Sequence, residues 1–309
     1  MGNRPRIVGV GVACLDYLFV APRAAAGGYA PLAAHLIQGG GLVGTALVAA
    51  ARLGAATEIW GWVGDDAEGQ EVLRGLRAEG VGVSRAEVVP GARTPVSFIH
   101  VDAQSGERTI YHGRRLGVPG DAARRVGERP LSCDVLLVDA IWPEASRAAA
   151  ARAQREGIPV VGDFCPNPEL ADLTRMVNAL IVPRGCAESL APGASREEQL
   201  RALASMGLQF VAITTGEEGC YYLAEGEVGH QPAFSMPVVD TTGAGDVFHG
   251  AFAYALARRW AAPRAVEFAA AAAALSCRAL GGRTAAPNRE EVGALLRAQG
   301  SHGWQELSD

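Results

Sequence analysis

The sequence predicts an α/β fold, namely a doubly wound and mainly parallel sheet with helices on both faces and a small β-sheet lid. Three observations lead to this prediction. Strand and helix patterns alternate regularly from residue 134 onward, two pairs of short strands earlier in the chain have no helix between their members, and two glycine-rich turns each lead into a helix. We expect residues 1–309 to form a single domain, with a discontinuous lid built from about residues 13–38 and 93–116.

The composition is that of an ordinary globular protein. With 309 residues, 49% hydrophobic and 20% charged, the chain can bury a sizeable core. The net charge of −5 and the lack of a basic cluster in the sequence argue against nucleic acid or a membrane as partner. The sequence contains no signal-peptide pattern and no run of transmembrane length, which predicts a cytoplasmic location. Its six cysteines have no C-x-x-C spacing, which predicts reduced thiols and argues against a disulfide framework or a zinc site.

An acidic residue follows the first predicted strand. Residues 7–12 form an apolar run, and Asp16 follows it before the strand pattern resumes at residues 17–20. Functional sites of α/β folds lie beyond the carboxyl ends of strands, so Asp16 is a candidate site residue, and a solvated turn aspartate is the alternative. Further short strands are predicted at 33–38, 95–101 and 108–112. A separate sheet of such strands would form a lid that excludes water from a site.

The first glycine-rich turn, Gly39–Gly44, precedes a helix at residues 45–53 and matches G-x-G-x-x-G. A dinucleotide-binding turn requires a strand of the main sheet directly before it and an acid closing the next strand. Here a lid strand precedes the turn, and residues 57–63 run into a predicted helix start at Asp65 or Asp66. We therefore favour a close approach of the backbone to a small polar ligand, and keep a NAD-dependent oxidoreductase as a remote alternative.

The second half of the chain has the β-α-β rhythm of a parallel sheet covered on both faces. Ser195 begins a capping box, Asn288 is the expected cap of the last helix, and residues 301–309 are expected to be a loosely held tail. A hairpin is expected at 220–223 and 228–231. Further strands are predicted at 135–139, 158–164, 180–182 and 210–214. Helices are predicted at 67–78, 144–156, 195–206, 247–259, 265–280 and 289–298.

The second glycine-rich turn lies within the stretch Asp240–Asp246 and leads into the helix at 247–259. Small residues let the backbone approach a ligand, and the free N–H groups and dipole of a helix N-terminus favour phosphate. Asp246 lies among those donors, placed to accept the proton of a substrate hydroxyl. Because a helix N-terminus favours the carboxylate, we expect a base without a raised pKa. This pattern predicts phosphoryl transfer to an alcohol, and an ordinary N-capped turn is the alternative.

Residues 240–250 resemble the C-terminal signature of the PfkB/ribokinase carbohydrate kinases, and Gly39-Gly40-Gly41 with its helix resembles their N-terminal signature. The two motifs stand in the family's order and together span nearly the whole chain. The resemblance implies a ribokinase-like α/β domain with a lid. It also implies ATP-dependent phosphorylation of a sugar or nucleoside hydroxyl, with Mg²⁺, and a possible homodimer formed through the lid.

The same resemblance assigns roles to individual residues. The catalytic base and its anion hole match Asp246, Gly243, Ala244 and Gly245. Substrate-binding positions are Asp16, Gly40, Gly41, Gly44 and His112. Nucleotide-binding positions are Thr214, Gly216, Gly219, Thr242 and Ser276. Family members also bind a monovalent cation, K⁺, through main-chain oxygens near Asp240, Thr242 and the segment after Ser276.

Two departures from the family pattern affect the site. The asparagine usual in the first signature helix is Gly44, so one sugar contact is missing or supplied differently. The Asn-x-x-Glu that organises Mg²⁺ would fall near residues 183–186, where neither residue is present, and Glu188 or Asp163 is the candidate substitute.

Residues 230–234, 247–249 and 281–283 resemble the ketohexokinase-like branch, which includes sulfofructose kinases. The sulfonate-binding positions of that branch do not match here, and they align with Gly28, His112 and Ile141. Arg114 and Arg115 could supply an anion contact. We therefore expect a neutral ketohexose such as fructose as acceptor. The alternatives are sulfofructose or another anionic sugar, a nucleoside, or a sugar-sensing protein with a degenerate kinase fold.

Overall fold

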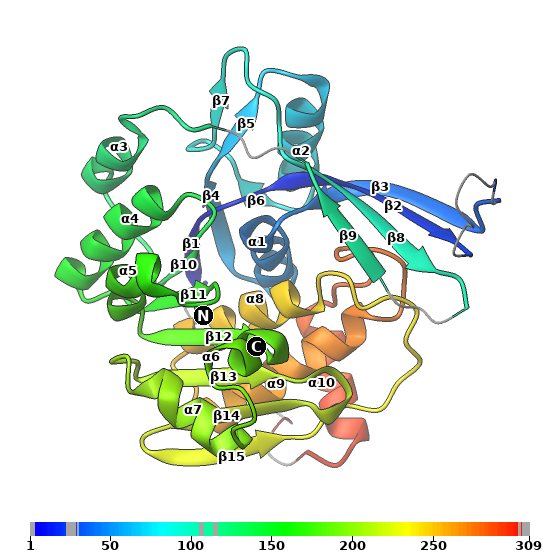
Figure 1. Ribbon diagram of the computed structural model, residues 1–309, viewed down its shortest axis with the longest axis vertical. Helices are drawn as coiled ribbons and strands as arrows, with labels where there is room; N and C mark the ends of the chain where they lie inside the picture. Colours follow the sequence, from blue (N-terminus) through cyan, green and yellow to red (C-terminus); the bar gives the residue numbers. More distant parts are fainter. Residues whose placement is uncertain are drawn as a thin grey trace.

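A nine-stranded sheet runs through the centre of the protein (Figure 1). The computed structural model describes residues 4–22, 29, 31–104, 108–113, 117–301 and 304. The strand order is β15-β14-β13-β12-β11-β10-β1-β4-β6, and pairing is parallel from β6 to β13 and antiparallel at β14 and β15. The strands are β1 (Arg6–Val10), β4 (Ala56–Trp60), β6 (Val81–Gly82), β10 (Val135–Asp139), β11 (Val160–Asp163), β12 (Ala179–Pro183), β13 (Phe210–Thr214), β14 (Cys220–Ala224) and β15 (Glu227–Gln231).

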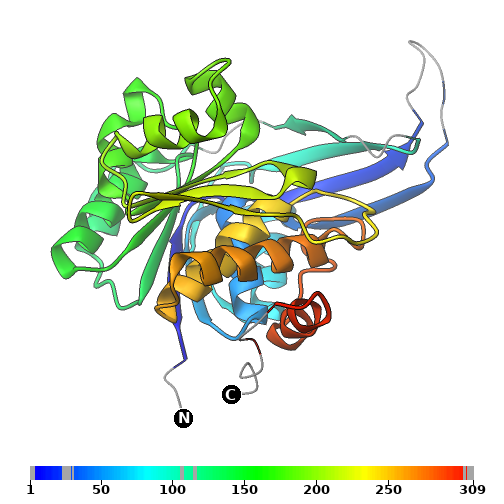
Figure 2. The ribbon, with the colours of Figure 1, turned by 90° about the horizontal axis from the view of Figure 1, so that it is seen from below.

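Each face of the sheet has its own hydrophobic core, because successive side chains of a strand point to opposite faces. In β1, Ile7 lies in one core, whereas Val8 and Val10 lie in the other. Figure 2 shows the two layers of helices. One face carries α1 (Leu42–Arg52), α2 (Ala67–Ala78), α8 (Ala244–Ala257), α9 (Ala262–Ser276) and α10 (Arg289–Ala298). The other carries α3 (Ala122–Glu128), α4 (Pro143–Glu156), α5 (Ala171–Met176), α6 (Arg184–Leu190) and α7 (Arg196–Ala204).

A second sheet of four strands projects to one side of the main sheet and forms the predicted lid (Figures 1 and 2). Its order is β3-β2-β8-β9, with β2 and β8 parallel and the other pairs antiparallel. Its inner face packs Leu18, Ile99 and Val101 against Leu280, which follows α9. The strands are β2 (Cys14–Ala21), β3 (Ala34–Gly40), β8 (Val96–Asp102) and β9 (Arg108–His112).

The strand predicted at residues 57–63 is wrong in one respect, because it breaks at Gly61. A Cβ atom on Gly61 would lie 2.8 Å from the carbonyl oxygen of Gly11, so the chain bends there. Beyond the break, β5 (Trp62–Gly64) pairs with β7 (Glu87–Val89) in a small parallel sheet of its own.

Several helix boundaries differ from their predictions. The helix α8 begins at Ala244 instead of residue 247, and α9 ends at Ser276 instead of residue 280. The short helices α3, α5 and α6 were not predicted; none of them has a side-chain cap at its N-terminus. The predicted caps at Asp66, Ser195 and Asn288 are confirmed, the last two as capping boxes.

Within the described ranges, none of the helices is both long and apolar enough to cross a bilayer.

The expectation of a loosely held C-terminal tail is wrong at Trp304, which is 1% exposed. Its indole packs on the rings of Trp260 and Phe268, with ring centroids 5.3 and 5.7 Å away. The indole N–H donates to Glu267 Oε2 at 2.7 Å. The tail carries few apolar residues, so the sequence pattern missed this one anchor.

Replacing Trp304 with alanine should lower the free energy of unfolding by about 3–5 kcal/mol, because it empties a large buried site. Urea unfolding monitored by circular dichroism measures the loss. Val238→Ala is the control, since Val238 is 61% exposed and should change stability by less than about 0.5 kcal/mol. Equal effects of both changes would contradict the anchoring role of Trp304.

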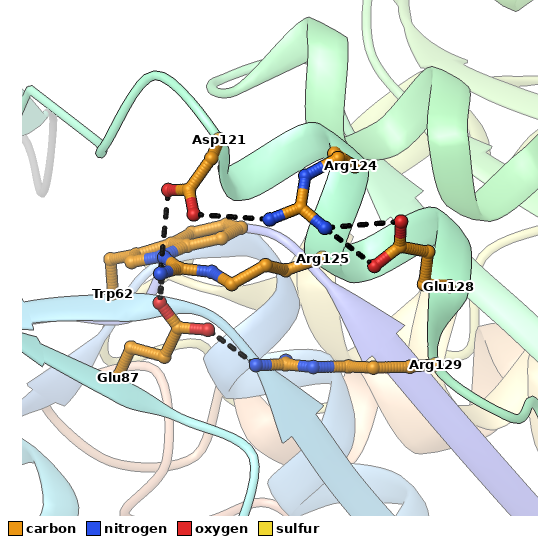
Figure 3. Close-up of polar contacts among 7 residues, drawn as sticks. All are labelled: Trp62, Glu87, Asp121, Arg124, Arg125, Glu128 and Arg129. Carbon is orange, nitrogen blue, oxygen red and sulfur yellow. Dashed lines mark hydrogen bonds and ion pairs between the residues drawn. The ribbon is translucent and has the colours of Figure 1, made fainter.

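An ion-pair network fastens α3 to the small β5–β7 sheet (Figure 3). The carboxylate of Glu87 pairs with Arg125 at 2.6 Å and with Arg129, and accepts the indole N–H of Trp62 at 3.0 Å. These side chains are largely shielded from water, so the charge of Glu87 matters more than that of an exposed ion pair.

Glu87→Gln should lower the free energy of unfolding by about 1–3 kcal/mol, because Arg129 loses its counter-charge and Arg125 keeps only that of Asp121. Thermal unfolding measures the loss. The matched control is Glu71→Gln, which removes the exposed pair of Glu71 with Arg74 and should cost less than about 0.5 kcal/mol. A loss no larger than in the control would show that the network does not hold α3.

Candidate active site

Helices α1 and α8, which each follow a glycine-rich turn, pack in close contact. A Cβ atom on Gly250 in α8 would overlap the carbonyl oxygen of Ala46 in α1, so the backbones approach more closely than side chains would allow. At the N-terminus of α8, a Cβ atom on Gly243 would lie 2.6 Å from Cα of Gly282. Two segments far apart in sequence therefore meet at one end of α8.

The turn before α8 presents unpaired amide groups. Gly243 is the N-cap residue with φ of 72°, a left-handed conformation that favours glycine. Within the described residues, the amides of Gly245 and Asp246 have no backbone acceptor. Gly245 is exposed and Ala244 is half-buried. The turn can therefore receive an anion such as a phosphate group.

Asp246 lies in the first turn of α8 and is half-buried. Burial raises the pKa of Asp246 well above its ordinary value, and the carboxylates of Asp163 and Asp16 raise it further, whereas Arg283 and Arg108 oppose them. The expectation that this pKa would not be raised is wrong, because it considered the helix terminus but neither the burial of Asp246 nor the carboxylates of Asp163 and Asp16. A carboxylate with a raised pKa is a stronger base for a hydroxyl proton.

Asp163 ends β11 and is held by His249 of α8. The Nε2 atom of His249 lies 3.5 Å from Asp163 Oδ1 and 3.1 Å from the carbonyl oxygen of Ile181, while Nδ1 lies 2.7 Å from the carbonyl oxygen of Gly245. Burial raises the pKa of Asp163, and His249 opposes the shift. The other oxygen, Asp163 Oδ2, is buried without a hydrogen-bond partner in the described chain.

The family's Mg²⁺ fits Asp163 better than Glu188. Mg²⁺ bound with a nucleotide takes one or two protein carboxylates, and the unpartnered Asp163 Oδ2 is such a ligand. Glu188 lies on α6 and pairs with Arg184 and Arg196. No cage of three or more His, Cys, Asp or Glu side chains is found in the described ranges, so nucleotide phosphates would complete the coordination.

A row of polar side chains crosses the inner face of the lid. The strand register aligns Gln38 of β3, Asp16 of β2, Ser97 of β8 and His112 of β9. Asp16 is 7% exposed, and burial raises its pKa. The sequence placed Asp16 after the first strand of the main sheet, whereas the structure places it within a lid strand. His112 is exposed.

The glycines of the first turn lie against this row. A Cβ atom on Gly40 would overlap Asp16 Oδ2, so a side chain there would displace the carboxylate. Gly41 is the N-cap residue of α1 with φ of 88°, and the amide of Gly44 donates to the carbonyl oxygen of Val12. Gly39 and Gly40 belong to the lid strand β3, so the condition for a dinucleotide-binding turn is not met and that alternative is wrong.

The predicted nucleotide-binding residues fall into two groups. Thr214 ends β13, and Gly216 and Gly219 bound the turn that follows it, both with positive φ. Thr242 lies before the α8 turn, and the buried Ser276 ends α9. The structure brings Thr242 close to the end of α9, since the amide of Asp240 donates to the carbonyl oxygen of Cys277 at 3.3 Å. No hydrogen bond or ion pair among the described residues joins these two groups.

Both carboxylate oxygens of Asp240 accept hydrogen bonds from neighbouring groups. Its Oδ1 accepts from the amide and hydroxyl of Thr242 at 2.8 and 2.7 Å, and its Oδ2 accepts from the amide of Gly281 at 2.8 Å. The carboxylate therefore shapes the turn before α8 and would not itself coordinate a cation.

The prediction of reduced thiols is wrong for one pair of cysteines. Cys165 and Cys186 form a disulfide between the segment after β11 and α6. Their Cα atoms lie 5.7 Å apart, although 21 residues separate them in sequence. Neighbouring parallel strands bring them together, which spacing along the chain does not reveal. The free cysteines of the described chain are Cys14, Cys133, Cys220 and Cys277.

Some site residues were not identified from the sequence, and others lie outside the described ranges. Gly28, Arg114 and Arg115 are outside them, and the amide of Ile141 donates to Asp139 Oδ1. The sequence indicated Arg283 only as part of the resemblance to the ketohexokinase-like branch. Its hydrogen bond to Thr45, which lies 238 residues away in the sequence, could not be predicted. Gln38 and Ser97 on the inner face of the lid were not identified from the sequence. The alternation of side chains along the lid strands could have indicated them, because it places them on the same face as Asp16.

Comparison with known proteins identifies the family. The model of the pfkB family of carbohydrate kinases matches residues 37–289. The chain is 32% identical to the ribokinase of Schizosaccharomyces pombe over 270 residues, which are 82% of this chain and 85% of that one. The chain belongs to the pfkB family of carbohydrate kinases.

Two further relatives extend the comparison. This kinase is 28% identical to the 2-dehydro-3-deoxygluconokinase of Thermoproteus tenax over 274 residues, 81% of this chain and 83% of that one. The structure of Arabidopsis thaliana ribokinase complexed with ribose and ATP has the same fold, with a TM-score of 0.80 at 23% identity over 96% of this chain and 99% of that one. The predicted ribokinase-like α/β fold with a lid is confirmed.

Family membership makes this protein an ATP-dependent phosphotransferase that acts on the hydroxyl of a sugar. The relatives compared include a ribokinase and not a ketohexokinase, so they confirm the family and not the narrower ketohexokinase-like branch.

Proposed function

We propose that this kinase transfers the γ-phosphoryl group of ATP to a hydroxyl of a neutral, ribose-like sugar, with Asp246 as the base. The observation that carries the proposal is the position of Asp246 in the first turn of α8, where its own amide and that of Gly245 are unpaired. The identity with a ribokinase favours an aldopentose over the ketohexose expected from the sequence. A nucleoside, which carries a ribose, is the second candidate.

Each part of the site has a defined task in this reaction. Asp16 on the lid accepts a hydrogen bond from one sugar hydroxyl, while Asp246 takes the proton of the hydroxyl that attacks phosphorus. The amides of Gly245 and Asp246 stabilise negative charge on the transferred group. Mg²⁺ held at Asp163 supplies charge neutralisation of the phosphates when bound. The lid keeps water from the reacting oxygen.

The charges around the site support a neutral acceptor. The carboxylates of Asp163 and Asp16 raise the pKa of Asp246, and Arg283 and Arg108 oppose this effect. An acidic sugar such as 2-dehydro-3-deoxygluconate would add negative charge to this group.

An acceptor panel tests the proposal. ADP release should be measured with ribose, deoxyribose, fructose, 2-dehydro-3-deoxygluconate, sulfofructose and adenosine, each with ATP and Mg²⁺. We expect the highest kcat/KM with ribose. A preference for fructose or for an acidic sugar would overturn the proposed acceptor. Absence of ADP release with every compound would overturn the proposed reaction.

We further propose that K⁺ increases the activity of this kinase. Support comes from the Asp240 carboxylate, whose three hydrogen bonds fix the turn next to the end of α9, where main-chain oxygens would hold the ion. Replacing tetramethylammonium chloride with KCl at equal ionic strength should raise kcat at least about fivefold, because K⁺ bound by these main-chain oxygens would stabilise the turn before α8. A change below twofold in the same assay would count against a cation site.

Finally, we propose that two copies pair through their lids. The outer face of the lid exposes Ile37, Phe98 and Tyr111, which the register places in one row with Tyr17. Such a contiguous apolar surface is typical of an interface. Light scattering should give a dimer mass that falls to a monomer on Phe98→Glu. A monomeric wild type would exclude this pairing.

A further inference from the structure

Arg283 reaches from the loop between α9 and α10 into the first glycine-rich turn. The side chain is buried, at 5% exposure for the residue. Its Nη2 donates to the carbonyl oxygen of Gly40 at 2.8 Å, and its Nε donates to Thr45 Oγ1 at 3.3 Å. These two bonds hold the planar guanidinium group in one orientation beside the acceptor side of the site.

The guanidinium group occupies the space that a side chain at residue 44 would need. A Cβ atom on Gly44 would lie 2.7 Å from Arg283 Nη2, and one on Gly39 would overlap Arg283 Nη1. The family's usual asparagine at position 44 and this placement of Arg283 therefore exclude each other. The arginine, together with Ala13, whose Cβ would lie 3.0 Å from a Cβ atom on residue 44, explains the glycine at this position.

One nitrogen of Arg283 is left for a ligand. Among the described residues, Nη1 has no hydrogen-bond partner and Arg283 has no ion pair. Nη1 is not one of the fully enclosed polar atoms without a partner, although the residue as a whole is buried. A buried guanidinium with an unused donor is costly unless another oxygen completes it.

A second unused donor lies on the lid, next to the loop that carries Arg283. Gln38 Nε2 is buried without a partner, and it lies so close to Gly281 that a Cβ atom there would overlap it. Gln38 is the neighbour of Asp16 in the polar row of the lid. Gly40 connects Arg283 with Asp16, because its carbonyl oxygen accepts from Arg283 Nη2 and a Cβ atom on it would overlap Asp16 Oδ2. Donors and an acceptor thus stand together at one edge of the site.

We propose that Arg283 determines acceptor specificity. Asp16 accepts a hydrogen bond from one sugar hydroxyl, and Arg283 Nη1 donates to the neighbouring hydroxyl. The Arg283 contact thereby replaces the one that the side chain of residue 44 makes in other family members. The ligand class is a pair of neighbouring hydroxyls on a neutral sugar, because one hydroxyl donates to a carboxylate while the other accepts from a cation. This inference rests on the proposed function, since it assigns the sugar contact of the same site.

A double-variant cycle tests the exchange between residues 44 and 283. Arg283→Ala should raise the KM for ribose about 10- to 100-fold, the loss of a hydrogen bond from a charged group, while the KM for ATP changes less than about threefold. Gly44→Asn alone should also raise the KM for ribose, because its side chain meets the guanidinium. The combined variant Gly44→Asn/Arg283→Ala should return to within about fivefold of the wild type.

Deoxy sugars supply a readout that a purely structural arginine would not change. The wild type should discriminate between ribose and the analogue that lacks the contacted hydroxyl, and Arg283→Ala should lose most of that discrimination. Ribose-dependent thermal shifts without ATP provide the same comparison in binding. The matched control is Arg278→Gln in the same loop, whose side chain bonds to Leu275 and Glu291. It should leave both the KM and the discrimination unchanged.

The outcomes separate the two proposals. A wild type that phosphorylates no sugar overturns the proposed function, and with it this inference. A wild type that phosphorylates ribose, together with an Arg283→Ala variant of unchanged KM and discrimination, overturns the inference alone. If Arg283→Ala fails to fold, Arg283→Lys is measured in its place: it should retain the charge but lose the deoxy-sugar discrimination, and full retention of that discrimination overturns the inference.

Discussion

Replacing Asp246 with asparagine should lower kcat by about 10²- to 10⁴-fold while substrate binding is largely kept. Asparagine has nearly the same shape as aspartate, so the turn before α8 survives, but it cannot accept the hydroxyl proton. Steady-state kinetics with ribose and ATP measure the loss, and thermal shifts with each ligand test whether binding is kept. Near-normal turnover in Asp246→Asn would remove this residue from the role of base.

The pH profile provides a second measurement on the same residue. Because burial and the Asp163 and Asp16 carboxylates raise the pKa of Asp246, the group is protonated over a wider range than an ordinary aspartate. Wild-type kcat/KM should therefore fall as the pH drops through this raised pKa, where the base is lost. The variant should lack this acidic limb. An unchanged acidic limb in Asp246→Asn would assign it to another group.

Gly243→Ala should lower kcat by about 10²-fold or more, because the unpaired amides of the α8 turn would lose their positions. Gly243 has φ of 72°, and its Cβ atom would lie 2.6 Å from Cα of Gly282, so both backbone conformation and space oppose a side chain. We also expect about 1–3 kcal/mol of lost stability from the strained residue. Kinetics and urea unfolding measure the two effects separately.

The matched control for Gly243→Ala is Gly75→Ala. Gly75 lies within α2, with nothing within 4 Å of a Cβ atom, so alanine should raise stability by about 0.5–1 kcal/mol and leave kcat unchanged. If Gly243→Ala retained wild-type kcat, the amide cradle would not stabilise the transferred group.

The fold could be predicted to a large extent because its signals are local. Hydrophobic runs, caps and turns act over a few residues, so the capping boxes at Ser195 and Asn288 and the strand Val135–Asp139 agree with their predictions. Elements with weak local signals were missed, among them α3 and α6. The break at Gly61 was also missed, because it depends on a contact with the distant residue Gly11.

The candidate site was predicted less completely, since chemistry there depends on neighbours that are remote in sequence. The motif itself indicated Asp246 and the glycines before it. The raised pKa of Asp246 depends on its burial and on two other carboxylates, and neither carboxylate lies near it along the chain. The disulfide between Cys165 and Cys186 likewise follows from the neighbouring positions of β11 and β12.

The sequence by itself determined the family, the α/β architecture with a lid, and the residues of the two glycine-rich turns, because these are written in short motifs and in periodic patterns. Only the tertiary structure decided which side chains lie against these turns. The alternation of the lid strands aligns Gln38, Asp16 and Ser97, and a distant loop places Arg283 where the side chain of residue 44 would stand. Such contacts depend on how strands and helices pack, and packing joins residues that no local pattern connects.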